Sequence, residues 1–147
     1  MTLPVSRKVK HTHHADDSVV LDHESRFLRR KVLTAASGLR FLVDLSRTTS
    51  VDRHEAFVLE DGRAVGVVPA EEELFQVKGD LIRLAWHIGN RHMPCQIESD
   101  RLLIQRDHVM RNMLERLGAA VTAVTEPFSP EGGAYGHGRT HAHAHAH

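Results

Sequence analysis

A change of pattern near the middle of the chain most constrains how it can fold. Between residues 18 and 69, short apolar segments follow the two-residue period of β-strands. After the segment PAEEE at residues 69–73, strand-like segments alternate with two segments of helical spacing. A chain of 147 residues is long enough for one ordinary domain or two small ones. The change therefore predicts two small domains that meet near residue 72.

The first half predicts a small, mostly antiparallel β domain over residues 18–72. In the segment LRFLVDLS, apolar residues alternate with other residues and define one face for a core, namely Leu39, Phe41, Val43 and Leu45. Ser37-Gly38 fits a hairpin turn, and Asp61-Gly62 is a stronger signal for one, because both Asp61 and Gly62 tolerate positive φ. Residues 1–17 are polar and basic without a period, so we predict a flexible arm there.

The second half, residues 73–136, predicts the order β-α-β-β-α-β of a ferredoxin-like domain, and thus an α+β chain overall. Asp80 and Asp107 can each cap a helix, and each is followed by apolar residues at helical spacing. Gly89-Asn90 is expected to end the first helix in a left-handed conformation, and Gly118 the second. Such a small domain buries a thin core, so we expect it to pair with a copy of itself.

Composition narrows the class of function. Lys and Arg together number 19, as do Asp and Glu, which argues against a nucleic-acid binder that neutralises phosphates. The basic set Arg26, Arg29, Arg30 and Lys31 is more typical of a solvated or protein-docking face. The single Cys95 excludes an intrachain disulfide and a four-cysteine zinc site. No apolar run resembles a signal peptide or a membrane span, so we expect a cytoplasmic, soluble protein.

Histidine is the unusual residue, with 13 copies, and five of them lie in the last eleven residues. Residues 137–147 predict a disordered tail, in which alanine separates His141, His143, His145 and His147. In an extended chain, residues two apart share a side and lie roughly 6.5–7 Å apart. Neutral imidazoles at that spacing can converge on nickel, copper or zinc. An affinity tag is the alternative interpretation; otherwise this tail, with His137, predicts metal capture.

Inside the second domain, His92 is expected on a loop just beyond the first helix. One imidazole cannot hold a metal strongly, but a two-fold axis would bring two copies together. A lone histidine is more often a surface or core residue, and His87 and Cys95 are expected to pack in the core. His108, at the start of the second helix, is exposed by pattern and is either an auxiliary ligand or a surface residue.

Four short motifs occur in order along the second half: GNRH at 89–92, DHV at 107–109, MLERLG at 113–118 and PFSPEGGAY at 127–135. With an early arginine-rich segment, the Asp61-Gly62 hairpin and a histidine-rich end, they resemble the UreE family of urease accessory proteins. The resemblance spans nearly the whole chain. GNRH alone is a weak signal, but the ordered set is specific.

The resemblance implies a homodimeric nickel metallochaperone that serves urease maturation. It implies an N-terminal β domain like the peptide-binding domains of Hsp40 chaperones, followed by a ferredoxin-like metal-binding domain. It carries a nickel site at the dimer interface onto His92, and it implies delivery to the GTPase UreG and to the complex of urease apoprotein with its accessory proteins. Some members have a second ligand two residues before His108, where this chain has Arg106.

We therefore predict Ni²⁺ binding, with Zn²⁺ or Cu²⁺ as competing ions, by a set of histidines: His92, His108, His137, His141, His143, His145 and His147. A passive nickel or zinc buffer is the alternative function. An enzyme with a histidine base is not expected, because the sequence has no G-x-S-x-G, H-E-x-x-H or phosphate-loop motif.

Overall fold

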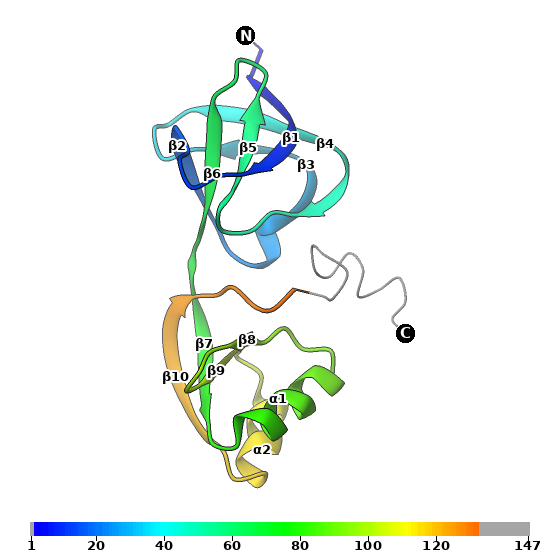
Figure 1. The fold of residues 1–147 in the computed structure, drawn as a ribbon, viewed down its shortest axis with the longest axis vertical. Coiled ribbons are helices and arrows are strands. Elements are labelled where there is room, and N and C mark those ends of the chain that lie inside the picture. The colour runs from blue at the N-terminus through cyan, green and yellow to red at the C-terminus, as the bar shows by residue number, and fades with distance from the viewer. Residues whose placement is uncertain (1, 133–147) are drawn as a thin grey trace. The chain divides into compact units, whose positions relative to one another are not determined.

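Residues 2–132 are described by the computed structural model of the chain (Figure 1), and they form two units. The first unit reaches Ala70, and the second runs from Glu71 to Glu131. The junction thus lies after Ala70, slightly earlier than the predicted one after residue 72. The predicted α+β class, with a β domain followed by a βαββαβ domain, is confirmed.

The first unit contains one six-stranded sheet with the strand order β2-β6-β5-β1-β4-β3. Its neighbours are antiparallel in three pairs, β1–β5, β3–β4 and β5–β6, and parallel in β1–β4 and β2–β6. A period of two cannot reveal the parallel pairs, because it is the same for both strand directions. The bounds are β1 Val5–His11, β2 Asp17–Leu21, β3 Phe27–Thr34, β4 Arg40–Ser50, β5 Glu55–Leu59 and β6 Ala64–Pro69, with a 3₁₀ turn, η1, at Glu24–Arg26.

The predicted flexible arm over residues 1–17 is wrong. Residues Val5–His11 form β1, which lies between β4 and β5 in the interior of the sheet. Within β1 only Ser6 is fully buried, and its hydroxyl donates to the Lys8 carbonyl oxygen at 3.1 Å. The strand therefore has no apolar alternation to signal it, and its place in the sheet comes from backbone hydrogen bonds to both neighbours.

The core of the first unit is aliphatic with two central phenylalanines. Phe41 and Phe57 are fully buried, and their ring centroids lie 5.9 Å apart. The apolar face predicted for 39–45 is confirmed, since Phe41, Val43 and Leu45 belong to this core. The basic set predicted at 26–31 is not one surface, because Arg26 is only 1% exposed and donates to the Leu21 carbonyl oxygen.

The second unit is a four-stranded antiparallel sheet with two helices, in the predicted order. The strand order β10-β7-β9-β8 is that of a ferredoxin-like domain. Both helices pack on one face, where Leu84 and Ile88 of α1 meet Met110 and Leu114 of α2 in a common core (Figure 1). The bounds are β7 Glu71–Lys78, α1 Leu81–Asn90, β8 Gln96–Ile97, β9 Leu102–Gln105, α2 His108–Arg116 and β10 Ala120–Pro127.

Both helices begin as predicted. The Asp80 carboxylate accepts from the Arg83 amide at 3.3 Å, and the Asp107 carboxylate accepts from the Met110 amide at 2.9 Å. Each cap satisfies a backbone donor that would otherwise lack a partner in the first turn. Within the described residues, neither helix has the length and apolar character that crossing a membrane requires.

The strand directions decide which loops share an end of this unit. The strand β7 is antiparallel to both β9 and β10. The helix α1 returns from the end of β7 to the start of β8, and α2 begins where β9 ends. The end of α1, the start of α2 and the end of β10 therefore all lie at one end of the sheet.

Candidate metal-binding site

The helix α1 ends in a Schellman motif, and His92 occupies its left-handed position. The His92 amide donates to the Gly89 carbonyl oxygen at 2.9 Å, and the Met93 amide donates to that of Ile88 at 3.3 Å. This pair of hydrogen bonds requires a positive φ at the first of the two donor residues, and φ of His92 is 59°. Met93 then packs against the core of the unit. The left-handed residue is therefore His92, and the prediction that Gly89-Asn90 would supply it is wrong.

The helix α2 ends in the same way, but with the usual residue. Gly118 has φ of 93°, its amide donates to the Glu115 carbonyl oxygen, and the Ala119 amide donates to that of Leu114. Glycine is common at this position because it lacks the Cβ that makes a left-handed backbone costly by about 1–2 kcal/mol. A histidine is less usual at the equivalent position of α1, and strained residues of this kind concentrate at functional sites.

The cap directs an accessible imidazole away from the fold. His92 is exposed, as are its neighbours Asn90 and Arg91. His87, one turn earlier, is half-buried, and its ring meets that of Trp86 edge to face with 5.0 Å between centroids. The predicted packing role fits His87, whereas His92 is free to approach a ligand.

His108 is the first residue of α2 and is exposed, so it lies at the same end of the unit as His92. The residue two positions earlier, Arg106, has a structural role. Its guanidinium donates to the carbonyl oxygens of Leu74 and Val124, both at 3.2 Å. Arg106 thus ties the start of α2 to β7 and β10 and contributes no ligand.

Cys95 packs against the core, as predicted. Burial, with a smaller contribution from Glu131, raises the pKa of the Cys95 thiol to about 11. A metal is bound by the thiolate, which is scarce at neutral pH when the pKa is so high. The structure therefore favours a packing role for Cys95 although it lies only three residues after His92.

The chain segment after β10 returns to the loop that carries His92. The Glu131 amide donates to the Cys95 carbonyl oxygen at 2.9 Å, and the Ser129 amide donates to the Gln96 side-chain oxygen at 2.8 Å. Phe128 is fully buried against Leu74 and Leu103 and anchors this segment. The described chain thus ends beside the C-terminal part of the loop that follows α1.

Within residues 2–132, no group of three or more His, Cys, Asp or Glu side chains is arranged to hold a metal. His92 and His108 are brought to one end of the unit. The predicted tail ligands His137, His141, His143, His145 and His147 lie outside the described residues. The sequence assigned no role to His54, whose ring lies beside that of His13 in the structure. The only sequence signal for this contact is the position of His54 in a loop next to a strand.

Comparison with known proteins decides the family. The description "UreE urease accessory protein, C-terminal domain" matches residues 64–147, and its N-terminal counterpart matches residues 3–70. This chain belongs to the UreE family.

Similar proteins named urease accessory protein UreE match most of this chain. That of Ruegeria pomeroyi is 58% identical over 145 residues, which are 96% of this chain and 97% of the relative. That of Ruegeria sp. strain TM1040 is 64% identical over 132 residues, 89% of this chain and 75% of the relative. That of Rhodobacter capsulatus is 60% identical over 126 residues, 86% of this chain and 81% of the relative.

Membership in UreE agrees with the family resemblance found in the motifs. It also agrees with the expectation that the chain is not an enzyme, since UreE proteins are named as accessory proteins. We therefore expect no catalytic step at His92.

The substitution His92→Gly is predicted to stabilise the fold. Glycine should relieve the left-handed strain, but its greater conformational entropy in the unfolded state offsets part of this effect. The free energy of unfolding should therefore rise by about 0.5–1 kcal/mol. The matched variant Gly118→Ala introduces the same strain at the end of α2, where a Cβ meets no atom within 4 Å, and should lose about 1 kcal/mol. Urea unfolding of the metal-free proteins measures both; a destabilised His92→Gly variant would contradict the assignment.

The substitution Cys95→Ser is predicted to leave metal affinity unchanged, because the thiol stays protonated and packs against the core. Calorimetric titration with Ni²⁺ measures the affinity. A drop of about tenfold or more, with the fold intact by circular dichroism, would mean that Cys95 is a ligand.

Proposed function

We propose that this UreE protein is a nickel metallochaperone that captures Ni²⁺ and delivers it for assembly of the urease active site. It acts in the cytoplasm as a homodimer and passes the ion to the GTPase UreG and the urease apoprotein–accessory complex. The observation that carries the proposal is the exposed His92 imidazole, held at a strained helix end in a chain of a urease accessory family.

The chemistry of the donor favours a late first-row transition metal. A neutral imidazole nitrogen suits nickel, copper and zinc, whereas magnesium and calcium prefer oxygen ligands. Zn²⁺ and Cu²⁺ are therefore competing ions. Nickel is the ion of choice here because the family serves urease, and this is the cargo that the motif resemblance implies.

A dimer would supply the second imidazole. One His92 per chain is too few ligands, and a two-fold axis close to it doubles the number. Ile82 and Trp86 lie one turn apart on α1 and are 87% and 63% exposed, and Val109 on α2 is 72% exposed. Large exposed apolar side chains on α1 and α2 are typical of a protein interface.

Tail histidines can complete the shell. The hydrogen bond from Glu131 to Cys95 fixes the last described segment beside the loop of His92. His137 follows six residues after Glu131, which spans about 20 Å when extended, and the later histidines reach farther. A site with some ligands fixed by the fold and others on a tether should hold an ion yet release it by ligand exchange, unlike a closed four-ligand cage.

The substitution His92→Ala is predicted to abolish the tightest Ni²⁺ site, because both copies of the ligand that the fold positions are lost. Removal of residues 137–147 should lower the number of ions bound and keep that tight site. Calorimetric titration of the full chain and the two variants measures affinity and stoichiometry.

An unchanged tight site in His92→Ala would sink the proposal. The same proteins can then be tested for delivery, because a chaperone speeds nickel loading of an acceptor and a passive buffer does not. Nickel-loaded full-length protein should load the acceptor faster than an equal concentration of Ni²⁺ bound to a simple chelator.

The substitution Trp86→Asp is predicted to give a monomer, because a charge at this exposed apolar position would be desolvated in the interface. The monomer should fold normally and lose the tightest Ni²⁺ site. Light scattering after size exclusion reports the mass. Lys8→Asp on β1, also at an exposed position, is the control and should remain dimeric; a Trp86→Asp dimer with full affinity would refute this interface.

A further inference from the structure

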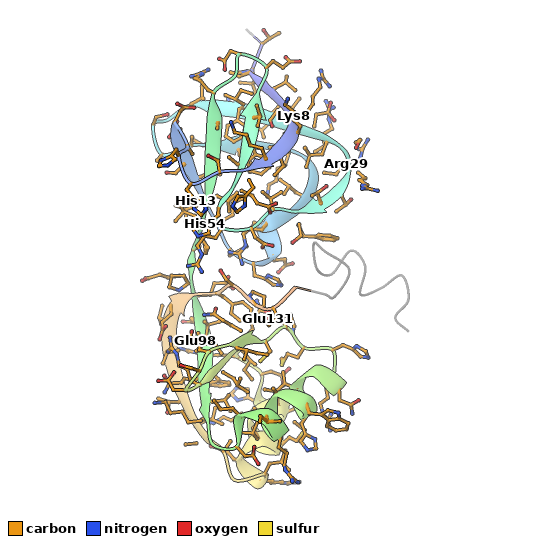
Figure 2. The ribbon with its side chains drawn as sticks, viewed as in Figure 1. Lys8, His13, Arg29, His54, Glu98 and Glu131 are labelled. Carbon is orange, nitrogen blue, oxygen red and sulfur yellow. The ribbon has the colours of Figure 1, made fainter. Side chains whose placement is uncertain are left out.

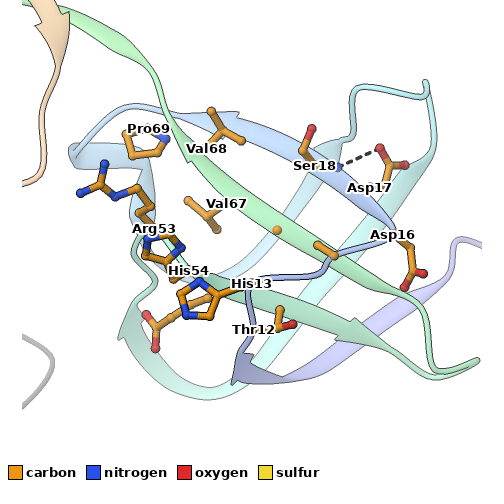
Figure 3. A pocket seen from close by; sticks show the side chains of 13 residues that line it. Thr12, His13, Asp16, Asp17, Ser18, Arg53, His54, Val67, Val68 and Pro69 are labelled. Atoms are coloured by element: carbon orange, nitrogen blue, oxygen red, sulfur yellow. Dashed lines mark hydrogen bonds between the residues drawn. The ribbon is translucent and has the colours of Figure 1, made fainter.

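Three histidines gather in the first unit, in addition to the site described above. The ring centroids of His13 and His54 lie 4.5 Å apart, those of His11 and His13 5.0 Å, and those of His11 and His54 6.4 Å. All three side chains are exposed to solvent. Figure 2 and Figure 3 show the rings of His13 and His54 side by side. We call these three residues the histidine cluster.

The sheet itself brings the cluster together. In the pairing of β1 with β5, His11 lies opposite Glu55, the residue after His54. The Thr12 amide then donates to the His54 carbonyl oxygen at 2.8 Å, which fixes the loop after β1 against the loop before β5. Thr12 separates His11 from His13 in the chain, yet the ring centroids of these two histidines lie only 5.0 Å apart.

His54 carries the same backbone strain as His92. Its φ is 70°, and within residues 2–132 these two histidines are the only non-glycine residues with positive φ. Such a conformation costs about 1–2 kcal/mol for a residue with a Cβ. Strained residues of this kind concentrate at functional sites, where the surrounding structure holds them in place.

The surroundings suit a neutral imidazole. Partial desolvation, and then the neighbouring His13, Arg53 and His11, lower the pKa of His54. The neutral ring is the form that binds a metal. His13 and His54 also line an open pocket of about 600 Å³, so an ion and its water ligands can enter from solvent (Figure 3).

We propose that His11, His13 and His54 form a second metal site, which takes a divalent late first-row transition ion with water in the remaining positions. Three imidazoles on one ion, at metal–nitrogen distances of about 2.0–2.1 Å, place their ring centroids roughly 4.5–6.5 Å apart. The separations in the cluster already fall in this range. In the described residues the three rings do not form a metal-holding arrangement, so binding an ion requires the imidazoles to reorient.

This site lies in a different unit from His92, and its existence does not depend on the proposed function. A cluster that merely packs its rings would respond to substitution with a change of stability and no change in metal binding. The proposal is therefore tested by binding measurements on full-length protein in which the other ligands have been removed.

The background protein is the full chain with His92, His108 and the five tail histidines replaced by alanine. Calorimetric titration with Ni²⁺ should show about one ion bound per chain, and backbone amide signals of residues 11–13 and 54 should shift or broaden in nuclear magnetic resonance spectra. In this background His54→Asn should weaken binding at least about tenfold, since loss even of an outer-shell partner typically costs 10–100-fold. Asparagine is chosen because it tolerates a left-handed backbone.

The matched control is His14→Asn, which removes an exposed histidine adjacent to His13 whose ring is outside the three contacts of the cluster. It should change the affinity for Ni²⁺ less than about twofold, as expected for a surface substitution that removes no ligand. A second variant, His13→Asn, should weaken binding as His54→Asn does, and it leaves the strained loop untouched. Absence of binding in the background protein, or equal loss in His14→Asn, would overturn the site.

Discussion

The hydrogen bonds that close the end of α1 determine where the candidate metal ligand lies. The Met93 amide reaches back to the Ile88 carbonyl oxygen, and this forces the backbone of His92 into the left-handed region. Both ends of that bond are held by packing, because Ile88 is fully buried and Met93 rests on the same core. The direction of the imidazole is therefore set by the aliphatic core beneath the helices, although the ring itself is in solvent.

The ferredoxin-like topology extends this constraint to the rest of the site. Since β7 runs antiparallel to β9 and β10, the end of α1, the start of α2 and the segment after β10 share one end of the sheet. His92, His108 and Glu131 consequently come from three separate parts of the chain to the same region. Exposed apolar residues on both helices offer a surface for a partner copy, which is how the proposed site would gain its second imidazole.

Local rules of sequence did not predict the backbone of the two histidines that we propose as metal ligands. Gly89-Asn90 offered a favourable left-handed pair, yet both residues belong to α1, and the left-handed position falls two residues after Asn90, on His92. His54 repeats this choice in the first unit. A cost of about 1–2 kcal/mol at each position is tolerable in a folded domain of several kcal/mol stability, and departures from local preference are expected where function needs a particular side chain.

The sequence by itself determined the two-unit order, the helix caps at Asp80 and Asp107, the α+β class and the family, because these depend on local periodicity, capping chemistry and short ordered motifs. Only the tertiary structure decided that β1 lies inside the first sheet, since its polar residues are held by backbone bonds that no side-chain pattern encodes. It alone decided the left-handed φ of His92, because that conformation depends on the packing of Ile88 and Met93. It alone also decided the contact between His13 and His54, because these residues lie far apart in the sequence.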